Sequence, residues 1–342
     1  MKIVSKDDFS EKLEISSLKP ESHEHNETLG IKYAILSCVF FGFTSFHIKS
    51  VKILYKESFD ANIFMFWRSL SSCLIGYLVA KYKSESILGI SRIKSKFWFG
   101  VRTFFNYISM ITLTLCMVEL RAATASCMSS MSPAIMVILS IIILGEKFHV
   151  RYLTGILICF IGSAMIVLNE KKPNPVIEEI ELIDGIENIE KIEDVVEETT
   201  DIIKGVFYGI YHIIFNSLCS VAQKILANEK IPVETQTYYI GLTNYLVAIF
   251  VAFYTGIDYI DFSFGGFSSL NGIFFYLCVH YMNESLKNIP LAKFTPFFYI
   301  GTLTVFVCGV VFIGESLFFT DIIGSLLILS FNIYNSYYPI KN

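Results

Sequence analysis

Long stretches of this 342-residue chain contain no charged residue. The run from Ala122 to Gly145 has no Asp, Glu, Lys or Arg, and neither has the run from Tyr152 to Asn169. Uncharged runs of 18 or more residues are typical of membrane-spanning helices, because a bilayer core of about 30 Å needs about 20 residues at 1.5 Å each. Only the short polar segment Gly145-Glu146-Lys147-Phe148-His149 separates the two runs. The absence of charge therefore predicts a transmembrane hairpin and argues against a soluble domain.

Motifs for catalysis and metal binding are also missing. The sequence has no HExxH, no GxSxG and no glycine-rich phosphate loop. We therefore expect no enzyme and no ATP-driven pump. No CxxC pair exists, which argues against a zinc site or a disulfide framework, so we expect no metal and no cofactor. We interpret the eight cysteines, most of which fall in apolar runs, as small buried apolar residues.

The composition supports a membrane location. The chain is 54% hydrophobic, with a mean hydropathy of +0.56, and a soluble domain of this kind would expose large apolar patches. The net charge of -4 does not describe the membrane-spanning part of the chain, because many of the acidic residues lie in one segment, 169–204. No apolar core appears before Ile31, so we expect no cleavable signal peptide. Nothing in the composition indicates nucleic-acid binding.

The hairpin pattern occurs twice. Phe294 to Gly314 is a second uncharged run, followed by Gly314-Glu315-Ser316 and the uncharged run from Ile322 to Ile340. A recurring unit of this size indicates internal duplication. In a membrane protein, duplicated halves are typical of transporters.

Each half contains five predicted spans. Five is odd, so the two halves must enter the membrane in opposite senses. The sequence therefore predicts an all-α polytopic membrane protein with ten transmembrane helices arranged as two inverted five-helix repeats. The expected spans are about 31–50, 61–80, 97–118, 122–145, 152–169, 205–226, 236–256, 266–286, 290–313 and 318–338.

The same pattern divides the chain into four parts. Residues 1–29 are polar and are expected to be a disordered tail, 30–168 form the first repeat, and 205–338 form the second. Residues 169–204 are rich in acid, and their Ile and Val residues recur at nearly every third position, which makes a poor helical stripe. We expect this segment to be a mobile acidic linker between the two halves, and whether it contains a short helix is left open. A regulatory or partner-binding role of the linker stays open.

The distribution of basic residues predicts the orientation. With the N-terminus in the cytoplasm, seventeen of the 27 lysines and arginines fall on the cytoplasmic side and eight on the opposite side. Since basic residues favour cytoplasmic loops, both termini are expected in the cytoplasm. Whether the membrane is the plasma membrane or an internal membrane is left open.

The motifs, in this order, resemble those of a known superfamily. They are Arg68 in FMFWRSLSS, the small residues before Pro133, the Gly145-Glu146 turn with TGILICFIGSAMIVL after it, and the second Gly314-Glu315 with DIIGSLLIL. The chain resembles the drug/metabolite transporter superfamily, in particular proteins with two EamA-type repeats, near the solute-carrier-35, nucleotide-sugar and triose-phosphate branches. The resemblance implies a solute transporter but no particular substrate. The second half departs from the first in the spacing of Pro290 and Pro296 before Glu315.

Two arginines lie inside predicted spans. Arg68 falls about eight residues, roughly 12 Å, into its helix, where a charge is costly and generally faces a cavity or a partner. Its guanidinium could bind a phosphate or carboxylate through two parallel contacts, or it could instead satisfy backbone carbonyls or pair with an acid. Arg102 lies nearer a basic loop, so its side chain could also reach the membrane surface.

Five further residues are weaker candidates for substrate binding. His280 and Asn283 share a polar face with Tyr281 and Glu284; proton coupling is one interpretation, and an ion pair of Glu284 with Lys287 or Lys293 is the simpler one. Lys293 begins the ninth span, where the resemblance to phosphate-handling relatives that carry a lysine suggests a role, although an ordinary loop lysine is the favoured interpretation. Asn106 and Tyr299 are expected to line the cavity. The histidines His47 and His212 are interpreted as structural.

The duplicated turns are interpreted as structural corners rather than functional acids. Gly145, Glu146, Gly314 and Glu315 sit at helix ends, where each carboxylate is expected to bond the amides of the helix that follows. The small residues from Ala122 to Ser130 allow close helix packing, which suits either a moving gate or a static interface.

These observations predict a secondary-active transporter of a small polar organic metabolite that works by alternating access, and whether the metabolite is an anion is left open. A non-transporting receptor, scaffold or trafficking protein is the alternative. The expected partners are a small-molecule substrate and the lipid bilayer, with no nucleic acid, and assembly as a homodimer is left open.

Overall fold

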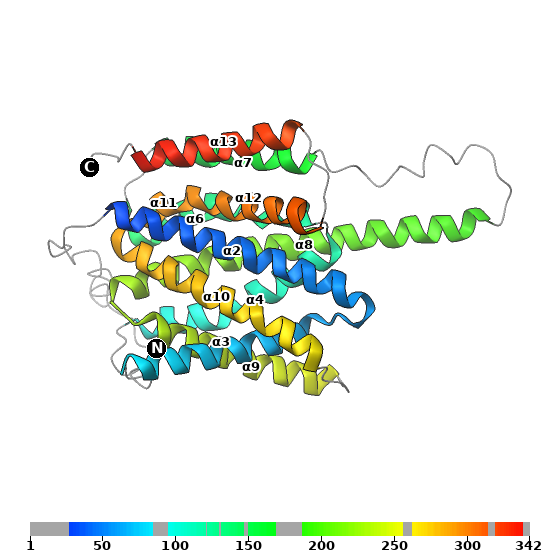
Figure 1. The fold of residues 1–342 in the computed structure, drawn as a ribbon, viewed down its shortest axis with the longest axis horizontal. Helices are drawn as coiled ribbons and strands as arrows, with labels where there is room; N and C mark the ends of the chain where they lie inside the picture. Colours follow the sequence, from blue (N-terminus) through cyan, green and yellow to red (C-terminus); the bar gives the residue numbers. More distant parts are fainter. Residues whose placement is uncertain are drawn as a thin grey trace, which may run out of the picture.

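The fold comes from a computed structural model, and every regular element within the described part of the chain is a helix (Figure 1). Seven helices are long and apolar enough to cross a membrane, and three shorter apolar helices accompany them. The prediction of an all-α polytopic membrane protein is therefore confirmed. The structure describes residues 27–84, 95–120, 122–129, 131–146, 150–168, 187–255, 262–313 and 319–337.

The helices follow the predicted spans closely, with the fourth span interrupted. In the first half they are α2 (Glu27–Tyr55), α3 (Ala61–Tyr82), α4 (Lys96–Glu119), α5 (Ala122–Ser129), α6 (Ser132–Leu144) and α7 (Val150–Leu168). In the second half they are α8 (Glu187–Asn228), α9 (Val233–Thr255), α10 (Phe262–Asn288), α11 (Leu291–Phe294), α12 (Phe298–Cys308) and α13 (Phe319–Tyr337).

Local sequence signals explain several helix ends. The Asp60 carboxylate precedes α3 and accepts hydrogen bonds from the amides of Asn62 and Ile63 at 2.7 and 2.9 Å, which satisfies two otherwise unpaired donors. Gly145 ends α6 with φ of +64°, in the left-handed region that glycine adopts without steric cost.

The fourth span is divided, although we expected a single helix, whereas the ninth is a continuous helical span whose hydrogen-bonding pattern changes along its length. The fourth is divided into α5 and α6, with Pro133 in the first turn of α6. The ninth passes from α11 through a 3₁₀ turn, Thr295–Phe297, into α12, and ends in the π-helical segment Gly309–Ile313. Proline lacks an amide hydrogen and clashes with the preceding turn, so Pro133 and Pro296 explain why the helical pattern changes at these points.

The sixth span begins earlier than expected. We predicted a mobile linker up to residue 204, but α8 is one helix from Glu187 onward, and Figure 1 shows it projecting beyond the bundle. Glutamate is a strong helix former, and its charge is favourable near a helix N-terminus, so the acidic segment can extend the buried helix into water. Likewise α2 begins at Glu27, inside the segment expected to be a disordered tail. Residues 1–26 and 169–186 lie outside the described chain.

Helices of the two halves pack against one another throughout the bundle. The extensively paired helices are α2 with α10, α4 with α8, α3 with α9, and α7 with α13. In Figure 1 the α7/α13 pair lies along one side and the α3/α9 pair along the other. We call the two ends of the bundle the Glu27 end and the Tyr55 end, after the first and last residues of α2.

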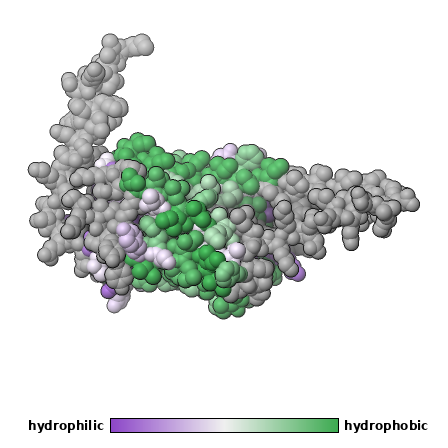
Figure 2. All heavy atoms as spheres, turned by 90° about the horizontal axis from the view of Figure 1, so that it is seen from above, coloured by the Kyte–Doolittle hydropathy of each residue, from purple (hydrophilic) through white to green (hydrophobic). Residues whose placement is uncertain are grey.

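The outer surface is apolar, as a lipid-facing surface requires. Large side chains such as Phe250, Phe253 and Phe312 are exposed, and Figure 2 shows apolar residues over much of the face seen from the α7/α13 side. A soluble protein rarely exposes so much apolar area, whereas lipid favours it. The fold and this surface together define a multi-pass integral membrane protein.

Candidate functional site

Arg68 is the largest side chain that the fold buries almost completely, at 2% exposure. It extends from α3, and its guanidinium carbon lies 4.4 Å from the ring centre of Phe275 on α10. Its Nη1 approaches the Met65 sulfur at 3.4 Å, while Nε and Nη2 have no hydrogen-bond partner among the described residues. The contact with the ring offsets part of the cost of burying the charge, but most donor sites stay open.

Arg102 on α4 is a second buried cation, at 4% exposure. The Nε of Arg102 also has no hydrogen-bond partner among the described residues. The thiol of Cys219 on α8 lies 3.9 Å from the backbone oxygen of Arg102. The thiol of Cys278 on α10 is near enough to both guanidinium groups to interact with them electrostatically. The structure therefore brings the two predicted arginines to one region between α3, α4, α8 and α10.

No carboxylate neutralises this pair within the described part of the chain. Three ion pairs between described side chains lie toward the Glu27 end: Lys83 with Glu234, Lys287 with Glu284, and Lys293 with Glu27. An unpaired charge away from water is unfavourable, so the two arginines are the strongest indication of a ligand site.

The predicted asparagines are buried and bonded to α9. Asn106 lies one turn from Arg102, and its oxygen accepts a hydrogen bond of 3.1 Å from Asn244. The Asn283 oxygen accepts one of 3.3 Å from Gln236. Asn106 therefore extends the arginine region, whereas Asn283 belongs to a separate contact between α9 and α10.

The other three candidates do not join the arginines. His280 stacks on Tyr276 and meets Tyr281 edge to face. Lys293 is buried and forms an ion pair with Glu27 of α2, so it is not an ordinary loop lysine. The Tyr299 hydroxyl donates to the Ile156 carbonyl at 3.2 Å and lies in a core cluster with α7 and α13. The simpler interpretation of Glu284, an ion pair with Lys287, is confirmed.

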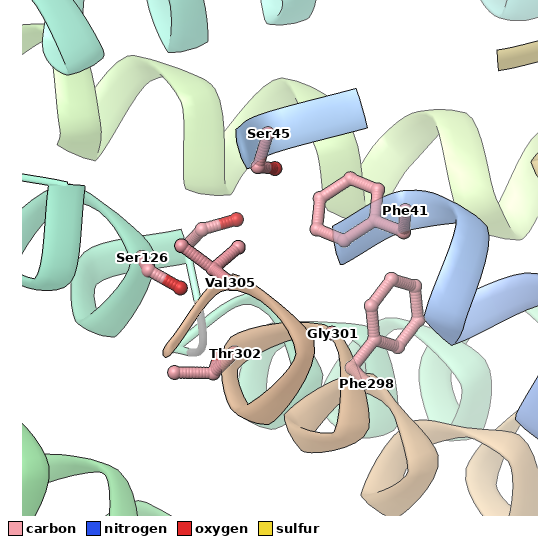
Figure 3. A pocket seen from close by; sticks show the side chains of 8 residues that line it. Phe41, Ser45, Ser126, Phe298, Gly301, Thr302 and Val305 are labelled. Atoms are coloured by element: carbon pink, nitrogen blue, oxygen red, sulfur yellow. The ribbon is translucent and has the colours of Figure 1, made fainter. Parts of the chain in front are cut away.

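A small pocket lies apart from the arginines, between α2, α5 and α12 (Figure 3). The rings of Phe41 and Phe298 form one wall, 5.9 Å apart and nearly perpendicular. Hydroxyl groups of Ser45, Ser126, Ser129 and Thr302 supply its polar lining. Gly301 and Val305 complete the wall. Its empty volume, including space open to solvent, is about 260 Å³, which is below the range of about 300–1,000 Å³ for sites that enclose small molecules.

His212 connects this pocket to α4, although we interpreted it from the sequence as an isolated structural residue. It lies in α8 and is 1% exposed. Its Nδ1 is 2.8 Å from the Ser109 carbonyl oxygen, and its Nε2 is 3.1 Å from the hydroxyl of Ser129, a pocket residue. Ser109 shares a face of α4 with Arg102 and Asn106. Only the packing of α4, α5 and α8 reveals this connection.

Glu146 contacts a different helix from the one we expected. Its two carboxylate oxygens accept hydrogen bonds from the amides of Leu291 and Ala292 at 2.8 and 2.9 Å. These amides begin α11 in the other half of the chain, rather than the helix that follows Glu146. The reason is that the left-handed turn at Gly145 directs the chain toward α11, whose first amides lack helical partners. Gly314 and Glu315 lie outside the described residues.

Two lysines, Lys224 buried and Lys49 partly buried, bond the C-terminal carbonyls of neighbouring helices. Lys224 on α8 donates to the carbonyl oxygens of Leu286 and Ile289, at the end of α10. Lys49 on α2 donates to those of Met117 and Leu120, at the end of α4, at 3.4 and 3.3 Å.

These contacts are duplicated residue by residue. The acceptors of Lys224, Leu286 and Ile289, are the counterparts of the acceptors of Lys49, Met117 and Leu120. Each counterpart lies the same number of residues further along the chain. Gly314-Glu315 follows Gly145-Glu146 by that interval as well. The α8/α10 pair therefore repeats the α2/α4 pair, in agreement with the duplication seen in the sequence.

No group of three or more His, Cys, Asp or Glu residues that could hold a metal ion occurs within the described ranges.

The fold and the buried site thus define a polytopic membrane protein with polar groups enclosed between two halves. Residues 28–168 match the model of the EamA-like transporter family, so the resemblance to the drug/metabolite transporter superfamily is confirmed for that part of the chain. No curated protein matches significantly. One solved crystal structure, whose title gives only "protein", aligns over 87% of this chain and 97% of its own with a TM-score of 0.62. At 15% identity, that likeness shows the fold alone.

Proposed function

We propose that this protein is a secondary-active transporter that carries a small organic anion across the membrane by alternating access. The observation that carries the proposal is the pair of buried guanidinium groups, Arg68 and Arg102, with no carboxylate partner in the described chain. The family match of the first half supports a membrane transporter.

The energetic argument favours an anionic solute. A charged side chain in the hydrocarbon region costs about 2.5–3.5 kcal/mol even on permissive scales. Two such charges near one thiol, Cys278, repel each other as well. A phosphate or carboxylate group would supply the missing counter-charge and accept the open donors of both side chains.

The duplicated contacts support alternating access. Lys49 and Lys224 make equivalent contacts at opposite ends of the bundle, as inverted halves require. The Lys224 contact with the Ile289 carbonyl, at 2.9 Å, is shorter than the equivalent contact of Lys49 with the Leu120 carbonyl, at 3.3 Å. We therefore propose that the Glu27 end is closed here, and that opening it while the Tyr55 end closes moves the solute.

The test is uptake by the full-length protein in proteoliposomes across nucleotide sugars, phosphorylated sugars, organic acids and amines. We expect uptake of an anion that is lost in Arg68→Ala and Arg102→Ala. Lys81→Ala is the matched control, because Lys81 is an exposed cation in the last turn of the same helix as Arg68. Uptake of an anion that persists in both arginine variants would contradict the proposed site.

The alternative is a receptor, scaffold or trafficking protein on the same fold. It predicts no uptake of any compound and an acid fixed beside Arg68, and the described residues provide no such acid. Exchange of preloaded substrate separates the two functions, since a non-transporting protein shows none.

We also propose that both termini face the cytoplasm, on the basis of the basic residues in the loops. In sealed vesicles of known orientation, a protease is expected to cut the acidic segment 169–204 only from the side opposite the termini. Cleavage from the cytoplasmic side would reverse the assignment.

A further inference from the structure

We propose that His212 is the proton-binding site of this transporter, and that the hydroxyl of Ser129 passes its protonation state to the pocket between α2, α5 and α12. The inference rests on the proposed transport function, and it names the coupling ion. The ligand is a proton taken from water, and no other co-reactant is required.

The hydrogen bonds of His212 determine which nitrogen is basic. The Ser109 carbonyl oxygen, 2.8 Å from Nδ1, has only lone pairs, so Nδ1 must carry a hydrogen. The Ser109 hydroxyl is also near Nδ1, at 3.2 Å. The neutral imidazole therefore keeps its free lone pair on Nε2, which faces the Ser129 hydroxyl at 3.1 Å.

The internal duplication shows that this histidine does more than join two helices. Ser37 in α2 is the counterpart of His212 in α8. The two residues are separated along the chain by the same interval as Lys49 and Lys224. The Ser37 hydroxyl donates to the Cys278 carbonyl at 3.0 Å, and Cys278 follows Ser109 by the interval that separates Leu286 from Met117. A serine thus suffices to link these helices. The histidine adds a second, basic nitrogen, directed at a residue of the pocket.

Protonation of His212 would change what the pocket offers a ligand. With neutral His212, the Ser129 hydroxyl donates to Nε2 and presents only lone pairs to the pocket. A proton transferred from water forms an Nε2–H bond, which then donates to the Ser129 oxygen. The Ser129 O–H bond then turns toward the pocket, where the hydroxyl can donate a hydrogen bond to an anion. Proton binding and anion binding thereby favour each other, as a symporter requires.

Few charged or titratable groups surround His212 in the described chain. On α4, Cys116 lies beside Gly209, one turn before His212, and Arg102 lies beside Cys219, two turns after it. Helix α6 carries no titratable residue, and α5 presents the hydroxyls of Ser126 and Ser129. The hydrogen bonds of α8 with α10 are made further along, by Gln223 and Lys224.

The first test needs no substrate. Nitrogen-15 NMR of the full chain, labelled at histidine and placed in lipid nanodiscs, would follow the ring nitrogens from pH 8.5 to pH 5. The His212 signals are assigned by their loss in His212→Gln and, independently of whether that variant folds, by their displacement in Ser129→Ala. His47→Gln is the control that leaves them in place.

We expect Nε2 of His212 to change from unprotonated to protonated as the pH falls, while Nδ1 stays protonated throughout. A His212 Nε2 that remains unprotonated to pH 5 would overturn the proposal. So would an unprotonated Nδ1 at high pH.

The second test uses the anion identified by uptake, measured first as exchange without a pH gradient. In the wild type, an inward proton gradient should accelerate uptake, and the lumen should acidify as the anion enters. In His212→Gln, the ratio of gradient-driven uptake to exchange should fall to one, while His47→Gln should keep the wild-type ratio. Acceleration that persists in His212→Gln overturns the inference. Absence of exchange in the wild type contradicts the transport function instead, and the NMR result still decides the proton site.

Discussion

At the scale of single residues, this protein places its charges where they are costly. Arg68 and Arg102 are almost completely buried, with open donors and a phenylalanine ring or a thiol as neighbours. Selection for stability alone would remove such groups, because an apolar side chain of similar size avoids the desolvation penalty. A binding site is the usual reason for keeping them.

This view predicts that Arg68→Met stabilises the protein while it abolishes anion uptake. We expect the free energy of unfolding to rise by about 1 kcal/mol or more, since an uncompensated charge is removed and the methionine fills much of the same volume. Thermal unfolding in nanodiscs measures the change, with Lys81→Met as the control, which should stay within about 0.5 kcal/mol of the wild type. A clear loss of stability would indicate instead that Arg68 has a structural role.

At the scale of helices, the ends are held by residues from other helices. Glu146 accepts from the first amides of α11, and Lys224 donates to the last carbonyls of α10. Opposite charges therefore stabilise opposite ends of the short connection between α10 and α11, as helix dipoles favour. The Glu146 contact also joins the first half to the second.

Removal of this N-terminal contact should loosen α11. In Glu146→Ala, we expect the Leu291 and Ala292 amides to exchange hydrogen about fivefold faster, which corresponds to about 1 kcal/mol for a lost helix cap. Hydrogen–deuterium exchange with mass spectrometry of the peptide that contains them measures this.

Glu284→Ala is the control, because the Glu284 carboxylate pairs with Lys287 on its own helix. Unchanged exchange at Leu291 and Ala292 in Glu146→Ala would show that the cap does not hold α11.

Close packing of α3 and α9 depends on Gly241. A Cβ atom there would lie 2.6 Å from the backbone nitrogen of Cys73, which cannot move aside as a flexible side chain would. Gly241→Ala should therefore destabilise the protein by about 1–3 kcal/mol.

Gly100→Ala on α4 is the matched control, since no atom lies within 4 Å of a Cβ there. It should stabilise the helix by about 0.5–1 kcal/mol. Equal effects of the two substitutions in thermal unfolding would contradict the packing argument.

At the scale of the whole molecule, two similar halves pack against each other along the bundle (Figure 1). The lysine contacts occur once in each half and at opposite ends, yet their lengths differ. In the proposed transport cycle, an exchange of long and short contacts between the halves turns one end from closed to open. Such an exchange needs little new structure, because both arrangements already exist in the molecule.

Loss of either lysine should shift this balance in opposite directions. Lys224→Met weakens the Glu27 end and should raise the labelling of a single cysteine placed at residue 288. Lys49→Met weakens the Tyr55 end and should raise the labelling of one placed at residue 119. Membrane-impermeant reagents applied to each side of sealed vesicles measure the two rates. Shifts of the same sign in both variants would contradict alternation between the ends.

The sequence by itself determined the class of the protein. Uncharged runs of bilayer length and the repeated Gly-Glu turn predicted the helical membrane fold and the duplication, because the absence of water constrains composition strongly. The two arginines were also recognisable, since a charge inside an apolar run is conspicuous. Their isolation from any acid in the described chain was not recognisable, because it depends on which helices meet.

Only the tertiary structure decided the partners. His212 resembled any single histidine until α4 and α5 placed Ser109 and Ser129 on its two nitrogens. Glu146 contacts a helix that lies far along the chain rather than the one that follows it. The helical repeat determines which face a residue occupies, but the contacts across that face follow from the packing of separate helices. That packing is a property of the whole fold, so no local pattern in the sequence contains it.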